Sequence, residues 1–133
     1  MNVDRRDILS TLPVVDEADY LRHMSAFVAS FVEARKRERW LYLLSNRPKR
    51  IGRDSHKLHS DLDRRKCRRI ENVPELARVT KPGVYYDFDD EARWLDVRTA
   101  MDFPYVDSVL SIDAGRWAVF FFHECETWLC ESK

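Results

Sequence analysis

Apolar residues recur at helical spacing in the first third of the chain. Behind Asp16 they follow one another at steps of three and four residues, which would place them in one stripe along a helix of about 18 residues. The members of this stripe are Leu21, Met24, Phe27, Val28, Phe31 and Val32. Asp16 can act as the N-cap, with Asp19 in the position that Glu takes in a capping box. After the charged residues 35–39 the spacing returns and predicts a second helix, or a continuation of the first, to about Leu44.

Charged residues dominate residues 49–70, and few aliphatic side chains lie between them. This pattern is typical of short helices and turns. Asp61 can cap a last short helix that starts at Leu62 and runs to about residue 69. We therefore expect the helical layer to cover about residues 16–70.

Side chains that favour β-structure dominate the last third of the chain. Residues 84–88 predict a strand. Residues 108–112 and 117–123 predict a hairpin, because Gly115 between them can adopt the positive φ of a hairpin bulge. A third strand over residues 127–131 would complete a meander. The middle strand of these three lacks polar alternation, so it should be central in the sheet and covered on both faces.

A short helix is expected between the first strand and the hairpin. Asp89, Asp90 and Glu91 supply the acidic first turn that helices prefer, and residues 92–101 would form the helix. Helices first and a mainly antiparallel sheet afterwards is the order of an α+β fold, in which N-terminal amphipathic helices pack on a small C-terminal sheet. A length of 133 residues predicts a single domain, with its sheet-rich part at about residues 84–131.

The charges are strongly sorted along the chain. Residues 34–69 carry fourteen basic and four acidic side chains, a net charge of +10, whereas residues 1–33 and 70–133 carry −3 and −7. A basic block attracts phosphate or acidic partners, but it can also pair with acidic segments of the same chain. We expect partial internal pairing.

The sequence contains no signal-peptide pattern and no apolar run of the roughly 20 residues that a membrane-spanning helix needs. Its three cysteines are an odd number without the spacing of a disulfide scaffold. These features predict a soluble, cytoplasmic protein with reduced thiols and no membrane partner.

Several common catalytic motifs are absent. Gly52, Gly83 and Gly115 lie too far apart for a phosphate-binding loop. The sequence has neither a Gly-x-Ser-x-Gly elbow nor a His-Glu-x-x-His zinc motif. Catalysis of an unrecognised type around His123 stays open, but we expect a protein that is not an enzyme and needs no cofactor.

Two pairs of side chains are weak candidates for a metal site. His56 and His59 would share a helical face, and His123 and Cys125 would face the same side of a strand. Structural zinc sites usually pair their ligands as Cys-x2-4-Cys, which this chain lacks. The alternative is a buried cysteine beside a hydrogen-bonded histidine.

The basic segment suggests nucleic-acid chemistry as an alternative function. His59, Asp61 and Asp63 have the side chains of a metal-dependent nuclease, although helix capping would explain both aspartates without an active site. A nucleic-acid surface would consist of Arg64, Arg65, Arg68 and Arg69, with Trp40 and Tyr42 as stacking groups. The isoelectric point of about 6.9 argues against a domain that relies on phosphate contacts.

An acidic cluster leads to the preferred hypothesis. Asp87, Asp89, Asp90 and Glu91 lie near the end of a predicted strand, and Trp94 could be an aromatic anchor beside them. Such a cluster can bind another protein by electrostatic steering. We therefore expect a protein-interaction module of the bacterial immunity or antitoxin-like type that binds and occludes a surface of its partner.

Overall fold

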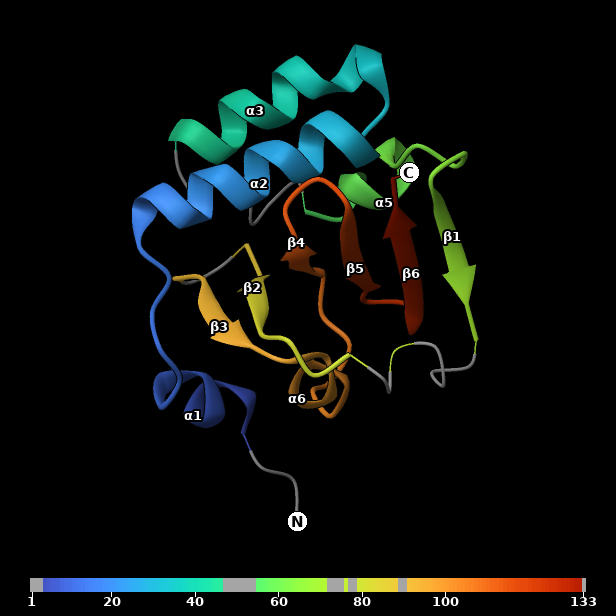
Figure 1. The fold of residues 1–133 in the computed structure, drawn as a ribbon. Coiled ribbons are helices and arrows are strands. Elements are labelled where there is room, and N and C mark those ends of the chain that lie inside the picture. The colour runs from blue at the N-terminus through green and yellow to red at the C-terminus, as the bar shows by residue number, and fades with distance from the viewer. Residues whose placement is uncertain (1–3, 47–54, 72–75, 77–78, 89–90, 133) are drawn as a thin grey trace.

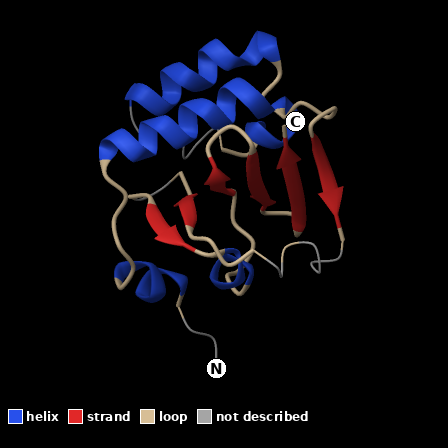
Figure 2. Ribbon diagram, viewed as in Figure 1, coloured by secondary structure: helices blue, strands red, loops and turns tan. Residues whose placement is uncertain are grey.

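The chain folds into a six-stranded antiparallel sheet with helices on both faces (Figure 1, Figure 2). The computed structural model describes residues 4–46, 55–71, 76, 79–88 and 91–132. The helices are α1 (Arg5–Ser10), α2 (Glu17–Phe31), the 3-10 turn η1 (Ala34–Lys36), α3 (Arg37–Asn46), α5 (Lys57–Asp61) and α6 (Val97–Met101). The strands are β1 (Cys67–Ile70), β2 (Gly83–Tyr86), β3 (Arg93–Leu95), β4 (Ser108–Asp113), β5 (Trp117–Phe122) and β6 (Glu126–Glu131), in the spatial order β1-β6-β5-β4-β2-β3. This arrangement confirms the predicted α+β class.

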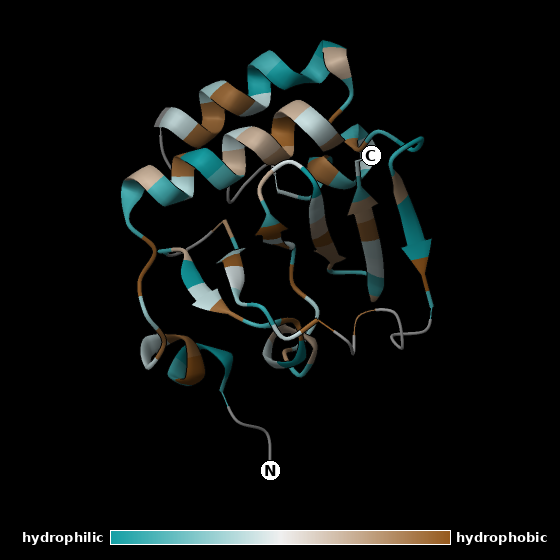
Figure 3. Ribbon diagram, in the orientation of Figure 1, coloured by the Kyte–Doolittle hydropathy of each residue, from teal (hydrophilic) through white to brown (hydrophobic). Residues whose placement is uncertain are grey.

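Helices α2 and α3 cover one face of the sheet, which we call the helical face. The carboxylate of Asp16 accepts the backbone N–H of Asp19 at 2.7 Å, so α2 begins where its capping residue predicts. Most of its apolar stripe is buried, and α3 adds Trp40, Leu43 and Leu44 to the same core. Figure 3 shows apolar and polar residues alternating along both helices. The sheet contributes Val84, Tyr86, Val109, Ala118, Phe120, Phe122 and Cys130 to this core.

The opposite face is covered by α1 and α6, a layer that the sequence pattern did not predict. Leu9 of α1 and Val97 and Ala100 of α6 are buried against it. The strand residues of this core are Ile70, Tyr85, Leu95, Leu110, Ile112, Val119, Phe121 and Leu129. Successive residues of β5 thus alternate between two apolar layers, and five of its six residues are buried. The prediction of a central strand that is covered on both faces is confirmed.

The predicted hairpin and meander are also confirmed. Strands β4 and β5 pair antiparallel with a shift of register between Ser111 and Asp113. Gly115 in the connection has a φ of 75°, a conformation that glycine adopts without strain. β6 pairs with β5 after a tight turn in which Cys125 has a φ of 63°. The C-terminal third is therefore the regular part of the sheet.

The helix expected from Leu62 to residue 69 is wrong. Helix α5 ends at Asp61, and residues Cys67–Ile70 form β1, which pairs antiparallel with β6. The backbone carbonyl of Asp63 accepts the N–H groups of Lys66 and Cys67, and this turn directs the chain into the strand. In β1, Cys67 is buried on the helical face and Ile70 on the opposite one. The helical layer therefore ends before residue 70.

The helix expected over residues 92–101 is shorter than predicted. Residues Arg93–Leu95 form β3, which pairs with β2, and α6 begins only after Asp96. The Asp96 carboxylate accepts the N–H of Thr99 at 2.8 Å and caps the helix. Glu91 lies outside the helix, and Asp89 and Asp90 lie outside the described residues. None of the described helices combines the length and the apolar character needed to cross a bilayer.

Candidate functional site

The acidic cluster favoured by the sequence does not form a common exposed surface in the described residues. The side chain of Asp87 is only 6% exposed and forms an ion pair with Arg5 of α1. Trp94 is half-buried against the core of the helical face, with its ring perpendicular to that of His23 at 5.8 Å between centroids. Glu91 is exposed. Asp87 thus fastens α1 to the sheet and is not available as an anionic contact for a partner.

The predicted stacking residues of the basic segment differ in exposure. Trp40 is 2% exposed, and its indole N–H donates to the Asp61 carboxylate at 2.8 Å. Trp40 therefore cannot stack on a nucleic-acid base in this structure, and Asp61 accepts this bond instead of capping a helix. Tyr42, two residues later in α3, is 56% exposed.

The four arginines predicted for a nucleic-acid surface, Arg64, Arg65, Arg68 and Arg69, lie in β1 or in the turn before it, at one edge of the sheet. β1 is the first strand in the sheet order, and Figure 1 shows no strand beyond it. The N–H of Glu131 donates to the carbonyl of Lys66 at 3.0 Å, so these two residues form a hydrogen-bonded pair of the ladder. Because such pairs alternate, the N–H and C=O of Arg69 point away from β6. No hydrogen bond to either group is present in the part of the chain that the structure describes.

Charged side chains flank this exposed backbone on both faces of the sheet. We call the group formed by Arg64, Arg65, Lys66, Arg68 and Arg69 the basic edge. Arg65 lies beside Asp63 at 3.3 Å, Arg68 is 3.9 Å from Glu131, and Arg69 is 3.9 Å from Glu126. The pKa of the Asp63 carboxyl is lowered, first by the backbone N–H of Arg65 and then by its guanidinium. Residues 64–69 themselves carry five cations and no anion, and the carboxylates that lie near them belong to neighbouring segments.

An open hollow of about 450 Å³ lies at the start of the basic edge. It is lined by Glu33, Ala34, Arg35, Asp63, Arg64 and Arg65. It separates η1 from the turn that leads into β1. Five of its six lining residues carry a charge, which suits a charged segment of a macromolecule better than an apolar small molecule.

A hydrogen-bonded cluster supports the basic edge from the helical face. His59 of α5 lies flat on Phe122, with 4.0 Å between the ring centroids, and its Nε2 is 3.0 Å from Glu126 Oε1. The same oxygen accepts the indole N–H of Trp128 at 2.9 Å. This bond, then the charge of Arg69, and then His59 lower the pKa of Glu126. Glu126 is therefore held as an oriented carboxylate beneath the strand.

Arg64 lies over one face of the Trp128 ring. Its guanidinium lies 4.1 Å from the ring centroid, and it donates to the carbonyl of His59 at 2.6 Å. The cation and the indole therefore stabilise each other, and the side chain is fixed to the sheet surface. A base could stack on this face of the ring only after displacing Arg64.

His123 and Asp107 form a separate pair at the β5–β6 end of the sheet. The Asp107 carboxylate binds both His123 Nδ1, at 2.9 Å, and the backbone N–H of His123, at 3.0 Å. The side-chain bond raises the pKa of His123. Because the folded-state pKa lies above the unfolded one, protonation favours the fold below the unfolded pKa, and this contribution is lost as pH rises through the raised pKa.

The substitution Asp107→Asn is expected to lower the pKa of His123. The new amide would keep an acceptor for the backbone N–H but would carry no charge for the imidazolium. An NMR titration of the His123 ring protons would measure the change. An unaltered midpoint in the variant would contradict the assignment of the raised pKa to Asp107.

The candidate metal ligands are not brought together. Among the described residues, no three His, Cys, Asp or Glu side chains lie close enough to hold a metal ion. His56 and Cys125 are exposed, whereas His59 and His123 each bind a different carboxylate. The arrangement of His59 with Asp61 and Asp63 that a nuclease would need is therefore not present.

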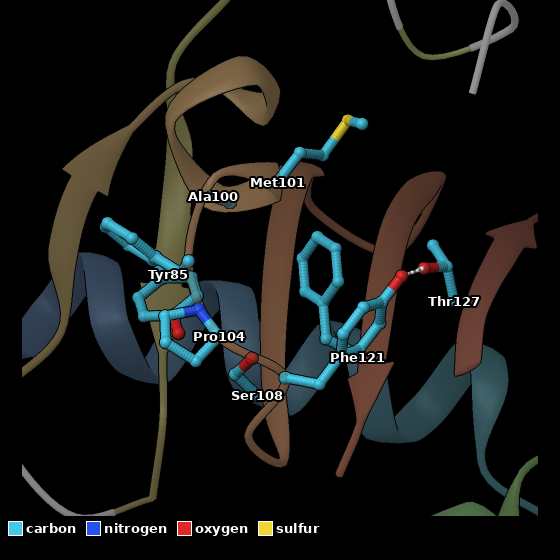
Figure 4. Close-up of a pocket in the computed structure, with 9 residues that line it drawn as sticks. Tyr85, Ala100, Met101, Pro104, Ser108, Phe121 and Thr127 are labelled. Carbon is cyan, nitrogen blue, oxygen red and sulfur yellow. Dashed lines mark hydrogen bonds between the residues drawn. The ribbon is translucent and has the colours of Figure 1, made fainter. Parts of the chain in front are cut away.

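A second hollow lies on the face covered by α6 (Figure 4). Its volume of about 30 Å³ has room for a water molecule or two, far less than an organic substrate needs. The hydroxyl groups of Tyr105 and Thr127 lie 3.0 Å apart at its rim. None of the predicted site residues lines it.

Sequence reasoning found the arginines of the basic edge but missed their position on an open strand. The only local sign of this strand was its pattern of two apolar end residues, Cys67 and Ile70, with two arginines between them. It also missed the group of Trp128, Glu126 and Arg64, because Arg64 reaches the two β6 residues only through the pairing of β1 with β6.

Comparisons of this chain with protein-family models, with curated proteins and with solved structures found no match. The function is therefore argued from the geometry alone.

Proposed function

We propose that the protein is a protein-interaction module that binds an extended, acidic segment of another protein along β1. One observation carries the proposal: the outward N–H and C=O of Arg69 lie on an open strand flanked by the basic edge. In β-augmentation, a peptide adds a strand to such an edge, and its backbone hydrogen bonds supply affinity. The flanking side chains then select the sequence that is bound.

Charge complementarity supports an acidic partner. Charged side chains on an edge strand commonly prevent pairing with another copy of the same sheet. The arginines around Arg69 would repel a second basic edge, yet they would attract Asp and Glu residues placed at alternate positions of an added strand. Protection against self-association and selection of an acidic partner are thus two effects of the same charges.

A protein partner accounts for the site better than a nucleic acid does. Trp40 is buried and one face of Trp128 is covered by Arg64, so two of the indole rings that could stack on bases are wholly or partly occupied. The outward N–H and C=O groups of the edge strand can form hydrogen bonds with the backbone of a bound peptide. In this proposal the module occludes a surface of its partner, as a bacterial immunity or antitoxin-like protein does, and it acts inside the cell without catalysis.

Reversal of charge at the basic edge is expected to abolish binding of an acidic strand. The probe is a fluorescein-labelled peptide in which Glu alternates with Val and Thr, and binding is followed by fluorescence anisotropy at low and moderate salt. We expect Arg68→Glu combined with Arg69→Glu to weaken binding at least tenfold, because attraction becomes repulsion. The same peptide with methylated backbone nitrogens should bind as weakly to the unaltered protein, because the added strand loses its donors.

Arg98→Glu, an exposed charge reversal on α6, serves as the matched control and should leave the affinity unchanged. Equal affinity for the normal and the methylated peptide would contradict strand addition. Tighter binding of single-stranded DNA than of the peptide, lost in the double charge reversal, would replace the proposal with a nucleic-acid function.

A further inference from the structure

Two buried thiols face each other across the pairing of β1 with β6. Cys67 and Cys130 are directly opposed in the strand register, and both side chains lie in the core of the helical face. Burial and the neighbouring Cys67 thiol raise the pKa of the Cys130 thiol well above its usual value, and Cys67 Sγ lies 3.6 Å from the carbonyl of Phe31. Both cysteines are free, and Cys125, the third cysteine of the chain, is exposed in a turn.

The type of strand pair suits a disulfide. The neighbouring residues Lys66 and Glu131 form a hydrogen-bonded pair, so Cys67 and Cys130 occupy the next, non-hydrogen-bonded position. At such positions the Cα atoms are about 4.5 Å apart, at the short end of the range of about 4.4–6.8 Å found for disulfides. The two strands therefore do not need to move apart or slide for the sulfur atoms to bond.

We propose that Cys67 and Cys130 form a reversible disulfide that links the edge strand to β6 when the protein meets an oxidant such as a peroxide or glutathione disulfide. With hydrogen peroxide, the thiolate of Cys67 attacks one oxygen and the O–O bond breaks, which leaves a sulfenic acid and releases hydroxide. The Cys130 sulfur then attacks the sulfenic sulfur, the S–S bond forms and the S–O bond breaks. In sum, two thiols and one peroxide yield one disulfide and two water molecules.

Their places in the sheet assign the two cysteines to different steps. Cys67 lies in a strand that is paired on one side only, so local opening of β1 exposes it to the oxidant. Cys130 lies in β6, between β1 and β5, and burial raises the pKa of its thiol well above the usual value. Cys130 therefore reacts second, after β1 has closed on it again. This inference does not depend on the proposed binding function.

The test uses the Cys125→Ser variant, in which Cys67 and Cys130 are the only cysteines. The folded protein is equilibrated in buffers with an increasing ratio of oxidised to reduced glutathione. Thiol exchange is then stopped with acid, and the mass of the intact protein is measured by mass spectrometry. We expect a loss of two hydrogen atoms, a cross-linked peptide pair that contains both cysteines, and recovery of the thiols with dithiothreitol. The melting temperature should rise by about 5–15 °C on oxidation, because the cross-link restricts the unfolded chain.

A variant that also carries Cys67→Ser is the control and should lose no hydrogen atoms. The unaltered protein, oxidised and mapped in parallel, shows whether the pair also forms when Cys125 is present. Two thiols that persist in the most oxidising buffer, glutathione adducts in place of the cross-link, or a link to Cys125 would each overturn the proposal.

Discussion

Replacing Trp40 by alanine is expected to lower the free energy of unfolding by about 3–5 kcal/mol. Its indole belongs to the core of the helical face and is only 2% exposed. The substitution removes this volume and also deprives Asp61, itself buried, of the indole N–H that it accepts at 2.8 Å. Urea unfolding followed by circular dichroism would measure the loss.

Two further variants separate these contributions. Trp40→Phe keeps most of the apolar volume but leaves the Asp61 carboxylate without its donor, which should cost about 1–3 kcal/mol. Tyr42→Ala removes an aromatic ring from the same helix that is 56% exposed and should cost clearly less than Trp40→Ala, because it leaves no cavity in the core. Equal losses for Trp40→Ala and Tyr42→Ala would show that the indole is not a core residue.

Replacing Asp87 by alanine is expected to destabilise the protein by about 3 kcal/mol. The Arg5 and Asp87 side chains are both largely buried, and their ion pair fastens α1 to the end of β2. Burial alone would lower the pKa of Arg5, but the hydrogen bond to Asp87 and the further interactions with Tyr85 and Asp87 together outweigh this effect and raise it. Loss of the carboxylate leaves the guanidinium with too few acceptors. Thermal unfolding and the hydrogen exchange of α1 amides would both record the change.

The paired variant Arg5→Met with Asp87→Leu tests whether the cost arises from the unpaired charge. Replacement of both partners by apolar side chains of similar size commonly restores stability. We therefore expect the double variant to be more stable than Asp87→Ala. A double variant that is less stable than the single one would mean that the ion pair, and not the avoidance of an unpaired cation, supports α1.

Local patterns predicted the elements whose stability is local. The helix behind Asp16 and the hairpin at Gly115 were found because a capping side chain and a glycine with positive φ act within a few residues. The central position of β5 was found because a strand buried on both faces has no polar alternation. These features depend little on distant segments.

Elements that depend on distant partners were missed or misplaced. β1 carries two arginines between buried ends, and its strand state depends on β6, whose opposing residue Cys130 lies far along the chain from Cys67. β3 was absorbed into a predicted helix because its pairing with β2 could not be seen from residues 92–101. Asp96 was not recognised as the cap that delays α6.

The candidate site was predicted only in part for the same reason. The sequence located the arginines, but it did not show that they lie along a strand at the edge of the sheet. Conversely, Asp87 belongs to an acidic sequence cluster, yet the distant Arg5 removes it from the surface. Charge along a sequence indicates which side chains need partners, and the fold decides which of those partners come from the same molecule.

The order of the layers along the chain has a consequence for synthesis on the ribosome. The apolar stripe of α2 ends at Phe31, but Phe120 of β5, which belongs to the same core, follows 89 residues later. Because synthesis adds about 5–20 residues per second, several seconds or more pass between the synthesis of α2 and that of the central strand. During that interval the stripe is exposed to any holding chaperone, so the decisive collapse of this protein is expected to follow the emergence of its last strands from the exit tunnel.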